Sequence, residues 1–289
     1  MSKPQPIGML FHPQVDRAQR RLDQVRRLLE QAGVPHWELI RENNPRGTGG
    51  DLAGTRLLLT LGGDGTFLYG AHLAAPLGVP VLGVNLGRLG FLTEVDADGI
   101  RTGLQRFLDG DYRLEERRLV QVAVLRDGRR TQRGLGLNEV VVQRGSEARL
   151  LRLQVAIDKQ EVGTIDADGA VVATATGSTA YSLAVGGPIL EPTLGDLVFV
   201  PMNPFALTVR PIVFAPGLIE ITLPRDTAVI SVDGTGRGKL KPGDTLQVDA
   251  YPKPLSVVRL GPPENFYRVL RQKLGWGTPL VPFPGEDDV

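Results

Sequence analysis

The sequence predicts a protein of the α/β class with a second, antiparallel domain. The chain has 289 residues, enough for one large domain or two ordinary ones. In its first third, short apolar runs alternate with segments of helical periodicity, which is typical of a parallel sheet covered by helices. From about residue 115 onward, period-two patterns between Gly- and Pro-rich turns take over. These indicate an antiparallel β-sandwich.

The first third contains four predicted strands and three predicted helices. The first helix starts at Asp16 and is stopped by Gly33, and its apolar residues are Ala18, Leu22, Val25, Leu29 and Ala32. The other two helices are predicted over 67–75 and around Ile100, Leu104, Phe107 and Leu108. The strands are predicted over 7–11, 37–40, 56–61 and 79–84.

The remaining chain alternates apolar and polar residues in short runs. Period-two runs occur over 120–124, 151–157, 219–223 and 230–232. Three of these runs end in turn dipeptides, which are Asp127-Gly128, Asp158-Lys159 and Asp233-Gly234. A short helix is predicted from Phe266 onward.

The composition excludes several classes of function. A net charge of +1 is too small for a polybasic surface that binds nucleic acid or an anionic membrane. Cys is absent, and the three His are scattered at 12, 36 and 72, so a zinc site is not expected. No signal-peptide pattern and no apolar stretch of bilayer length is found. We therefore expect a cytoplasmic protein.

The stretch LGGDGTFLYG, residues 61–70, places one carboxylate among glycines at the end of a predicted strand. Ligands of open parallel sheets bind at such ends, and glycines followed by a helix start suit phosphate. An anionic Asp64 would repel that phosphate unless a metal or a proton transfer accounts for it. A tight turn in which Asp64 caps the helix explains the same residues about equally well.

The common nucleotide motifs are absent from this sequence. The segment DGTGRGK, residues 233–239, lacks the first glycine of a P-loop and the Ser or Thr after its lysine. No GxGxxG follows a predicted strand. A phosphate would therefore bind to a different kind of loop.

Three further stretches combine glycines with polar residues. They are GVNLGRLGFL at 83–92, Asn138-Glu139 before an apolar run, and TATGSTAYSLAVGG at 174–187. Each has a structural explanation, because Asn138-Glu139 fits an edge strand and Ser178 or Thr179 fits a helix N-cap. Four such stretches in one chain favour a ligand site.

These motifs, together with the terminal KLGW, resemble the bacterial NAD kinase family over about residues 57–276. GGDGT also has relatives in diacylglycerol-type lipid kinases and phosphofructokinases, whereas Asn-Glu followed by TGSTAYS is specific. The resemblance implies a Rossmann-like α/β domain and a β-sandwich, with the C-terminal segment returning to the first domain. The predicted domains are then 1–112 plus 265–289, carrying GGDGT, and 113–264, carrying Asn-Glu and TGSTAYS.

The resemblance also implies roles for single residues. Asp64 matches the proposed proton acceptor, which faces the 2′-hydroxyl of the adenosine ribose of NAD. Gly62, Gly63 and Thr66 complete the implied phosphate loop. The implied substrate-binding residues are Asp64, Gly65, Asn138, Glu139, Arg149, Asp166, Asp168, Thr179, Ala180, Tyr181, Ser182, Ala184 and Thr235.

Four positions depart from the usual residues of the family. Ala175 replaces proline, Ala184 a frequent serine, Phe205 a frequent histidine, and Asp166 a basic residue of several relatives. None of them lies in GGDGT or Asn-Glu, so they bear on specificity rather than on the reaction.

The implied reaction transfers the γ-phosphoryl of ATP, or of polyphosphate, to NAD. Mg²⁺ or Mn²⁺ would arrive with ATP, since the sequence offers no dedicated carboxylate cage. The expected partners are NAD, ATP and further copies of the chain, in a homodimer or homotetramer, with no nucleic acid or membrane. A diacylglycerol-type lipid kinase and a catalytically idle NAD(P)-binding regulator are the alternatives.

Overall fold

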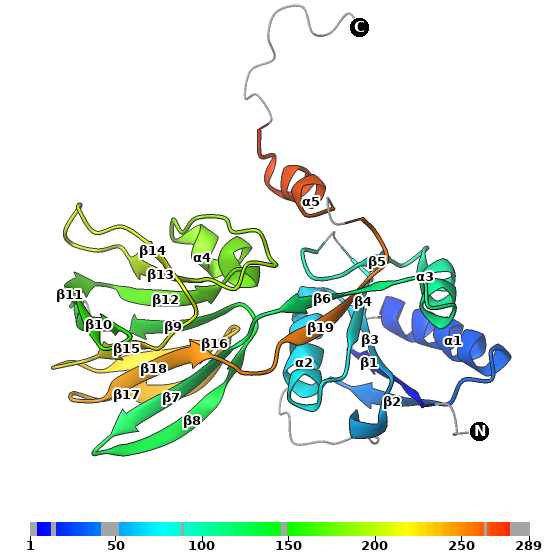
Figure 1. Ribbon diagram of the computed structural model, residues 1–289, viewed down its shortest axis with the longest axis horizontal. Helices are drawn as coiled ribbons and strands as arrows, with labels where there is room; N and C mark the ends of the chain where they lie inside the picture. Colours follow the sequence, from blue (N-terminus) through cyan, green and yellow to red (C-terminus); the bar gives the residue numbers. More distant parts are fainter. Residues whose placement is uncertain are drawn as a thin grey trace, which may run out of the picture.

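Three β-sheets build the protein, one in a first domain and two in a second (Figure 1). The computed structural model describes residues 5–12, 16–41, 52–87, 90–145, 149–262 and 265–277. The predicted α/β domain followed by a β-sandwich is confirmed. Arg88 and Leu89 of the 83–92 motif lie outside the described residues.

The sheet of the first domain has the strand order β2-β1-β3-β4-β19-β6, and β5 pairs with β4. All of its neighbouring strands are parallel except the antiparallel pair β19 and β6. The strands are β1 (Ile7–Phe11), β2 (His36–Ile40), β3 (Leu57–Gly62), β4 (Val81–Asn85), β5 (Val95–Asp96), β6 (Arg113–Arg117) and β19 (Leu255–Arg259).

Helices cover both faces of this sheet, as the near-continuous apolar strands require. α1 (Asp16–Gln31) and α3 (Ile100–Leu108) pack on the face that carries Leu57, Leu59 and Leu61. α2 (Asp64–Ala74), which continues into the 3₁₀ turn Ala75–Leu77, packs on the opposite face against Leu58. The four predicted strands and three predicted helices are therefore all present, with ends shifted by up to three residues.

The predicted domain limits need a correction at both places where the chain passes between the two domains. They place β6 and β19 in the sandwich domain, but these strands pair with each other and with β4 in the first sheet. The alternating pattern of β6 predicts a strand but does not show to which sheet the strand belongs. Strands pair with partners that can lie far away in the sequence. By sheet membership, the sandwich begins after Arg117 and ends before Leu255.

The second domain packs two antiparallel sheets around one apolar core. The first has the order β11-β10-β15-β18-β7-β8, and the second has the order β14-β13-β12-β9-β16-β17. The first comprises β7 (Val120–Arg126), β8 (Arg129–Gly136), β10 (Leu151–Ile157), β11 (Gln160–Ala167), β15 (Ile219–Thr222) and β18 (Thr245–Ala250). The second comprises β9 (Glu139–Arg144), β12 (Gly169–Thr174), β13 (Leu197–Met202), β14 (Ile212–Phe214), β16 (Ala228–Val232) and β17 (Thr235–Leu240).

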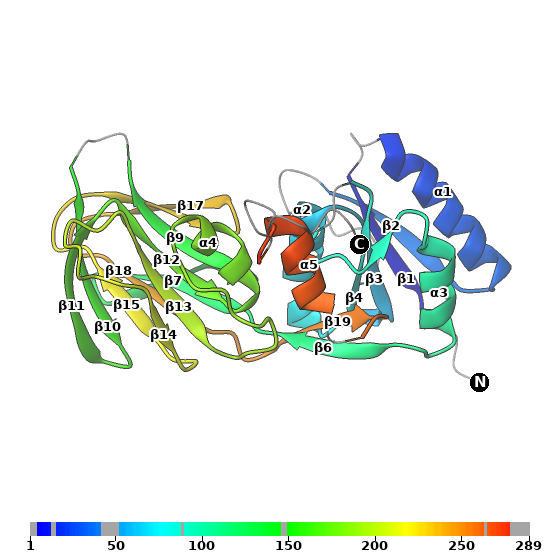
Figure 2. The same ribbon diagram turned by 90° about the horizontal axis from the view of Figure 1, so that it is seen from above.

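Two short helical segments and a terminal helix complete the fold. The 3₁₀ turn Thr176–Thr179 and α4 (Tyr181–Ala184) follow β12. Val185 and Leu190, which come next, pack on the outer face of the second sandwich sheet, around Val171 and Val198. α5 (Asn265–Leu274) follows β19 and lies between the two domains in the view of Figure 2. None of the described helices is long and apolar enough to cross a membrane.

Candidate active site

Asp64 is the first residue of α2, directly after the turn that leaves β3. Gly63 is the N-cap and has no side chain that could cap the helix. The Thr66 N–H donates to Gly63 O at 2.9 Å, which leaves the N–H groups of Asp64 and Gly65 for a ligand. Gly62 makes room for the turn, since a Cβ there would lie 2.3 Å from the Thr66 hydroxyl. The β3–α2 turn therefore has the backbone geometry that suits an anion at a helix start.

The Asp64 carboxylate points away from its own helix and binds the loop after β4. The Phe91 N–H donates to Oδ2 at 3.1 Å, and the Leu92 N–H donates to Oδ1 at 3.2 Å. Gly90 permits this approach, because a Cβ there would lie 2.1 Å from Oδ1. Asp64 thus does not cap α2, so the helix-cap explanation is wrong, and its side chain stays about one-third exposed (34%).

Two cations that were not among the predicted site residues lie beside this turn. Lys273 of α5 places its Nζ 3.8 Å from Asp64 Oδ2 and 4.6 Å from the centre of the Phe91 ring. Arg41, which follows β2, has its guanidinium 3.3 Å from where a Cβ of Gly65 would lie. Both come from segments remote in sequence, and only the KLGW motif, which contains Lys273, indicated one of them. Together they make the surroundings of Asp64 favourable for phosphate.

Asn138 and Glu139 lie at the start of β9, which runs between β12 and β16 and is not an edge strand. The edge-strand explanation is therefore wrong. The Asp233 carboxylate holds this turn, because it accepts the N–H groups of Leu137, Asn138 and Glu139 at 2.7–2.9 Å. His72 of α2 places its Nε2 2.7 Å from the same carboxylate. Asp233 therefore ties the Asn-Glu turn to the helix that carries Asp64.

The TGSTAYS segment packs on the Asn-Glu turn. The Thr174 N–H donates to Asn138 O at 2.9 Å, and the Thr174 hydroxyl donates to Leu137 O at 2.6 Å. Only glycine fits at position 177, since a Cβ there would lie 2.0 Å from Asn138 O. α4 then begins after Ala180, not after Ser178 or Thr179, so the N-cap explanation of these hydroxyls is wrong.

The other predicted site residues of this region differ in how far their side chains are exposed to solvent. Thr179 bonds Thr176 O at 3.3 Å, and Tyr181 is 39% exposed on α4, which ends at Ala184. Ser182 is buried, and its hydroxyl has no partner among the described residues. Thr235 starts β17 one residue beyond the Asp233-Gly234 turn. By strand register, Thr235 and the segment that follows β12 lie at the same end of the second sandwich sheet as Asn138.

Glu139 is the buried carboxyl of this group. Its Oε2 has no hydrogen-bond partner among the described residues, and the residue is 6% exposed. Burial and the charge of Asp233 raise the pKa of Glu139 to about 7, although the Tyr181 N–H acts in the opposite direction. Near neutral pH, Glu139 can therefore either donate or accept a hydrogen bond toward a ligand.

This pKa predicts a pH dependence of stability between about pH 4.5 and 7. In that window the folded chain holds a proton on Glu139 that the unfolded chain has released, so stability falls as pH rises. The full effect is on the order of 3 kcal/mol, at about 1.4 kcal/mol per unit of pKa difference. Denaturant unfolding at pH 5 and 8 measures it, and the difference between the two values should shrink by that amount in Glu139→Gln. An equal difference in both proteins would contradict the prediction.

Arg149, Asp166 and Asp168 form a separate group on the far strands of the sandwich. Arg152 binds Asp166 through two hydrogen bonds of 2.7 and 2.8 Å and lowers the pKa of that carboxyl. Asp168 accepts bonds from Asn203 at 3.0 Å and Arg144 at 2.6 Å, which lower its pKa. Arg149 and Asp166 line a cavity together with the 79% exposed Phe205. The described contacts do not connect this group to Asp64.

The side chains around Asp64 provide few donors for a divalent metal ion such as Mg²⁺ or Mn²⁺. Among the described residues, no group of three His, Asp or Glu could hold a metal ion. Asp64 offers one carboxylate that already accepts two N–H groups. The described residues therefore do not form a resident metal site.

Two family models match the chain, and they describe the two domains of one kind of enzyme. Residues 48–112 match the ATP-NAD kinase N-terminal domain, and residues 137–260 match the ATP-NAD kinase C-terminal domain. The NAD kinase of Heliobacterium modesticaldum is 43% identical over 224 residues, which are 76% of this chain and 79% of that protein. The NAD kinase of Gemmatimonas aurantiaca is 42% identical over 226 residues, which are 76% and 77% of the two chains.

Two solved structures share the fold. Yeast NADH kinase in complex with NADH superposes with a TM-score of 0.87 at 24% identity, covering 97% of this chain and 90% of that one. An NAD kinase from Archaeoglobus fulgidus in complex with ATP gives a TM-score of 0.71 at 23% identity, covering 91% and 97%. The site around Asp64, the matched domains and the bacterial relatives agree, and the chain belongs to the NAD kinase family.

Proposed function

We propose that this chain transfers the γ-phosphoryl group of ATP to the 2′-hydroxyl of the adenosine ribose of NAD. The observation that carries the proposal is the carboxylate of Asp64, the first residue of α2, which accepts the N–H groups of Phe91 and Leu92 and is still one-third exposed. Neither a lipid kinase nor an idle regulator is favoured, since the relatives are NAD kinases and Asp64 is intact.

In this reaction the 2′-oxygen of the ribose forms a bond to the γ-phosphorus, and the bond from that phosphorus to the β–γ bridging oxygen breaks. ADP leaves, and the hydroxyl proton passes to Asp64 and then to water. Phosphoryl transfer depends mainly on positioning and charge neutralisation. A carboxylate is a weak base toward a hydroxyl, so Asp64 chiefly orients the hydroxyl and takes the proton late.

The chain supplies positive charge for the phosphates from three sources. These are the N–H groups of Asp64 and Gly65 at the start of α2, the Lys273 ammonium 3.8 Å from Asp64 and the Arg41 guanidinium beside Gly65. Mg²⁺ or Mn²⁺ enters as the counterion of ATP. Gly62, Gly63 and Thr66 shape the turn, while Asn138, Glu139 and Tyr181 provide polar groups for the dinucleotide.

The remaining predicted contacts stay proposals. They concern Gly65, Asp168, Thr179, Ala180, Ser182, Ala184 and Thr235, and the two residues Arg149 and Asp166 of the separate group. Arg152 pairs with the Asp166 carboxylate, so the negative charge at this departure from the family is compensated.

The test is the formation of NADP by the purified protein from NAD and Mg²⁺-ATP, followed with an NADP-dependent dehydrogenase. We expect turnover with NAD and none with NADP, whose 2′-oxygen is already phosphorylated. Parallel reactions with polyphosphate and with diacylglycerol define the donor and the acceptor. Phosphorylation of diacylglycerol without NADP formation would replace the proposal by the lipid-kinase alternative.

We also propose that the enzyme is a cytoplasmic homodimer or homotetramer. Phe205 and Leu207 are 79% and 83% exposed beyond β13, and Val213 on β14 is 46% exposed. Exposed apolar side chains gathered in this way mark association surfaces. Light scattering should give at least twice the 31.2 kDa mass of the chain. A monomer at micromolar concentration would contradict this proposal.

A further inference from the structure

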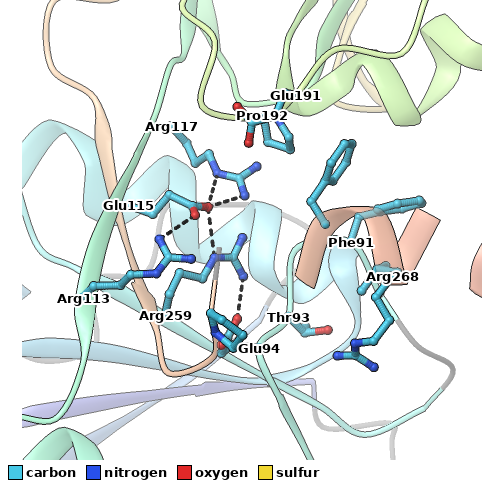
Figure 3. Close-up of a pocket in the computed structure, with 14 residues that line it drawn as sticks. Phe91, Thr93, Glu94, Arg113, Glu115, Arg117, Glu191, Pro192, Arg259 and Arg268 are labelled. Carbon is cyan, nitrogen blue, oxygen red and sulfur yellow. Dashed lines mark hydrogen bonds and ion pairs between the residues drawn. The ribbon is translucent and has the colours of Figure 1, made fainter. Parts of the chain in front are cut away.

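A second group of charges lies between the domains, beside the loop that holds Asp64. Arg113, Arg117 and Arg259 converge on Glu115, from the neighbouring strands β6 and β19 (Figure 3). Arg259 also binds Glu94 at 3.0 Å. These side chains, except for Arg113, are less than one-tenth exposed.

This group contains more positive than negative charge. Three guanidinium groups face two carboxylates, and Glu94 additionally accepts the N–H groups of Leu260 and Gly261 at 2.7–2.8 Å. Burial and the charge of Arg259 lower the pKa of Arg117 to about 10, and the neighbouring arginines lower the pKa of Glu115 to about 2. The buried members balance, since Arg117 and Arg259 face Glu94 and Glu115, and the excess positive charge belongs to Arg113, which is 36% exposed. This guanidinium is therefore the one that remains available to an anion.

The same side chains line a cavity that is partly open to solvent. The cavity has a volume of about 80 Å³, several times the roughly 10–15 Å³ that one water needs. Arg268 of α5 and Glu191 before the loop to β13 complete its charged lining. Two buried polar atoms of lining residues, Thr93 Oγ1 and Arg113 Nε, have no hydrogen-bond partner among the described residues. The cavity therefore offers room, positive charge and unused hydrogen-bonding groups.

We propose that this cavity is a binding site for a small tetrahedral oxyanion of the phosphate class. Guanidinium groups match the oxygens of phosphate in geometry and charge, and a threonine hydroxyl adds a neutral donor. The volume suits one phosphate group and not a whole nucleotide. The ligand is either free inorganic phosphate or one phosphate group of a larger molecule that reaches in from the open side.

The position of the cavity gives its occupation a structural consequence. Gly90 and Phe91 line it, and the Phe91 N–H donates to the Asp64 carboxylate. α5 lines it through Arg268 and also carries Lys273, which approaches Asp64. An anion in the cavity would therefore steady two of the elements that position Asp64. The binding proposal itself does not depend on the proposed kinase reaction.

The test is calorimetric titration of the full chain with inorganic phosphate at constant ionic strength, with chloride as the compensating anion. We expect saturable binding that weakens at least about tenfold in Arg113→Gln/Arg268→Gln, since both side chains line the cavity. Arg271→Gln is the matched control, an exposed arginine one turn further along α5, and should bind phosphate as the wild type does. Arg268→Gln alone, at an exposed position, keeps the test valid if the double variant fails to fold.

A second titration in the presence of saturating ATP distinguishes the sources of the ligand. If the variant-sensitive phosphate binding persists, the site takes free phosphate, and if ATP abolishes it, the site takes a phosphate group of the nucleotide. Absence of saturable phosphate binding in the wild type, or equal binding in the wild type and Arg268→Gln, would overturn the proposal. NADP formation is a separate measurement, so failure here leaves the proposed function untouched.

Discussion

Asp64→Asn should lower the turnover of NADP formation by about 10²–10⁴-fold, the usual contribution of general-base assistance. The amide keeps the size of the side chain but cannot take up the proton of the ribose hydroxyl. It also replaces one of the two oxygens that accept the N–H groups of Phe91 and Leu92. Because most of the proposed NAD contacts lie elsewhere, we expect the KM for NAD to change much less than kcat.

The coupled NADP assay measures this effect, and Asp98→Asn is a suitable control. Asp98 lies just after β5 in the first domain, is 93% exposed and contacts only Arg21 in the described part of the chain. Its replacement should leave kcat within about twofold, as expected for a surface substitution away from the site. If Asp64→Asn kept more than about a tenth of the wild-type kcat, Asp64 would not be the proton acceptor.

Asp233→Asn should destabilise the protein by about 2–4 kcal/mol and weaken NAD binding as well. The Asp233 carboxylate is 1% exposed and accepts three backbone N–H groups, in addition to contacting His72. An amide offers one oxygen, so at least one buried N–H loses its acceptor and faces an NH₂ group. The Asn138-Glu139 turn would lose its support, and with it the alignment of two polar groups for the dinucleotide.

Asp127→Asn is the matched control for this substitution. Asp127 has φ 49° and precedes Gly128 at φ 73°, while Asp233 has φ 45° and precedes Gly234 at φ 73°. Asn tolerates this left-handed backbone as well as Asp does, so both variants keep the turn. Asp127 is exposed, and we expect its variant to unfold at the wild-type urea midpoint. Equal midpoints for the two variants would show that the Asp233 carboxylate is not needed.

The sequence predicted those helices and strands that are specified by residues within the same short segment. α1 follows the spacing from Ala18 to Leu29, and it ends before Gly33, whose φ of 64° explains why glycine stands there. By contrast, β6 and β19 could not be assigned to the first sheet, since their partners lie about 140 residues apart in the chain. The same holds for Lys273 and Asp64. It also holds for His72 and Asp233, a contact that joins the two domains.

The sequence by itself determined the two-domain class, the family resemblance and the identity of Asp64 as the central carboxylate. These three properties could be predicted because they depend on glycine positions, apolar periodicity and the order of motifs, which are all visible along the sequence. Only the tertiary structure decided what the Asp64 carboxylate does, because its hydrogen-bond donors come from the loop after the next strand and its cation from the last helix. It likewise decided that Glu139 is buried and that three arginines surround Glu115, since burial and charge pairing arise from residues that only folding brings together.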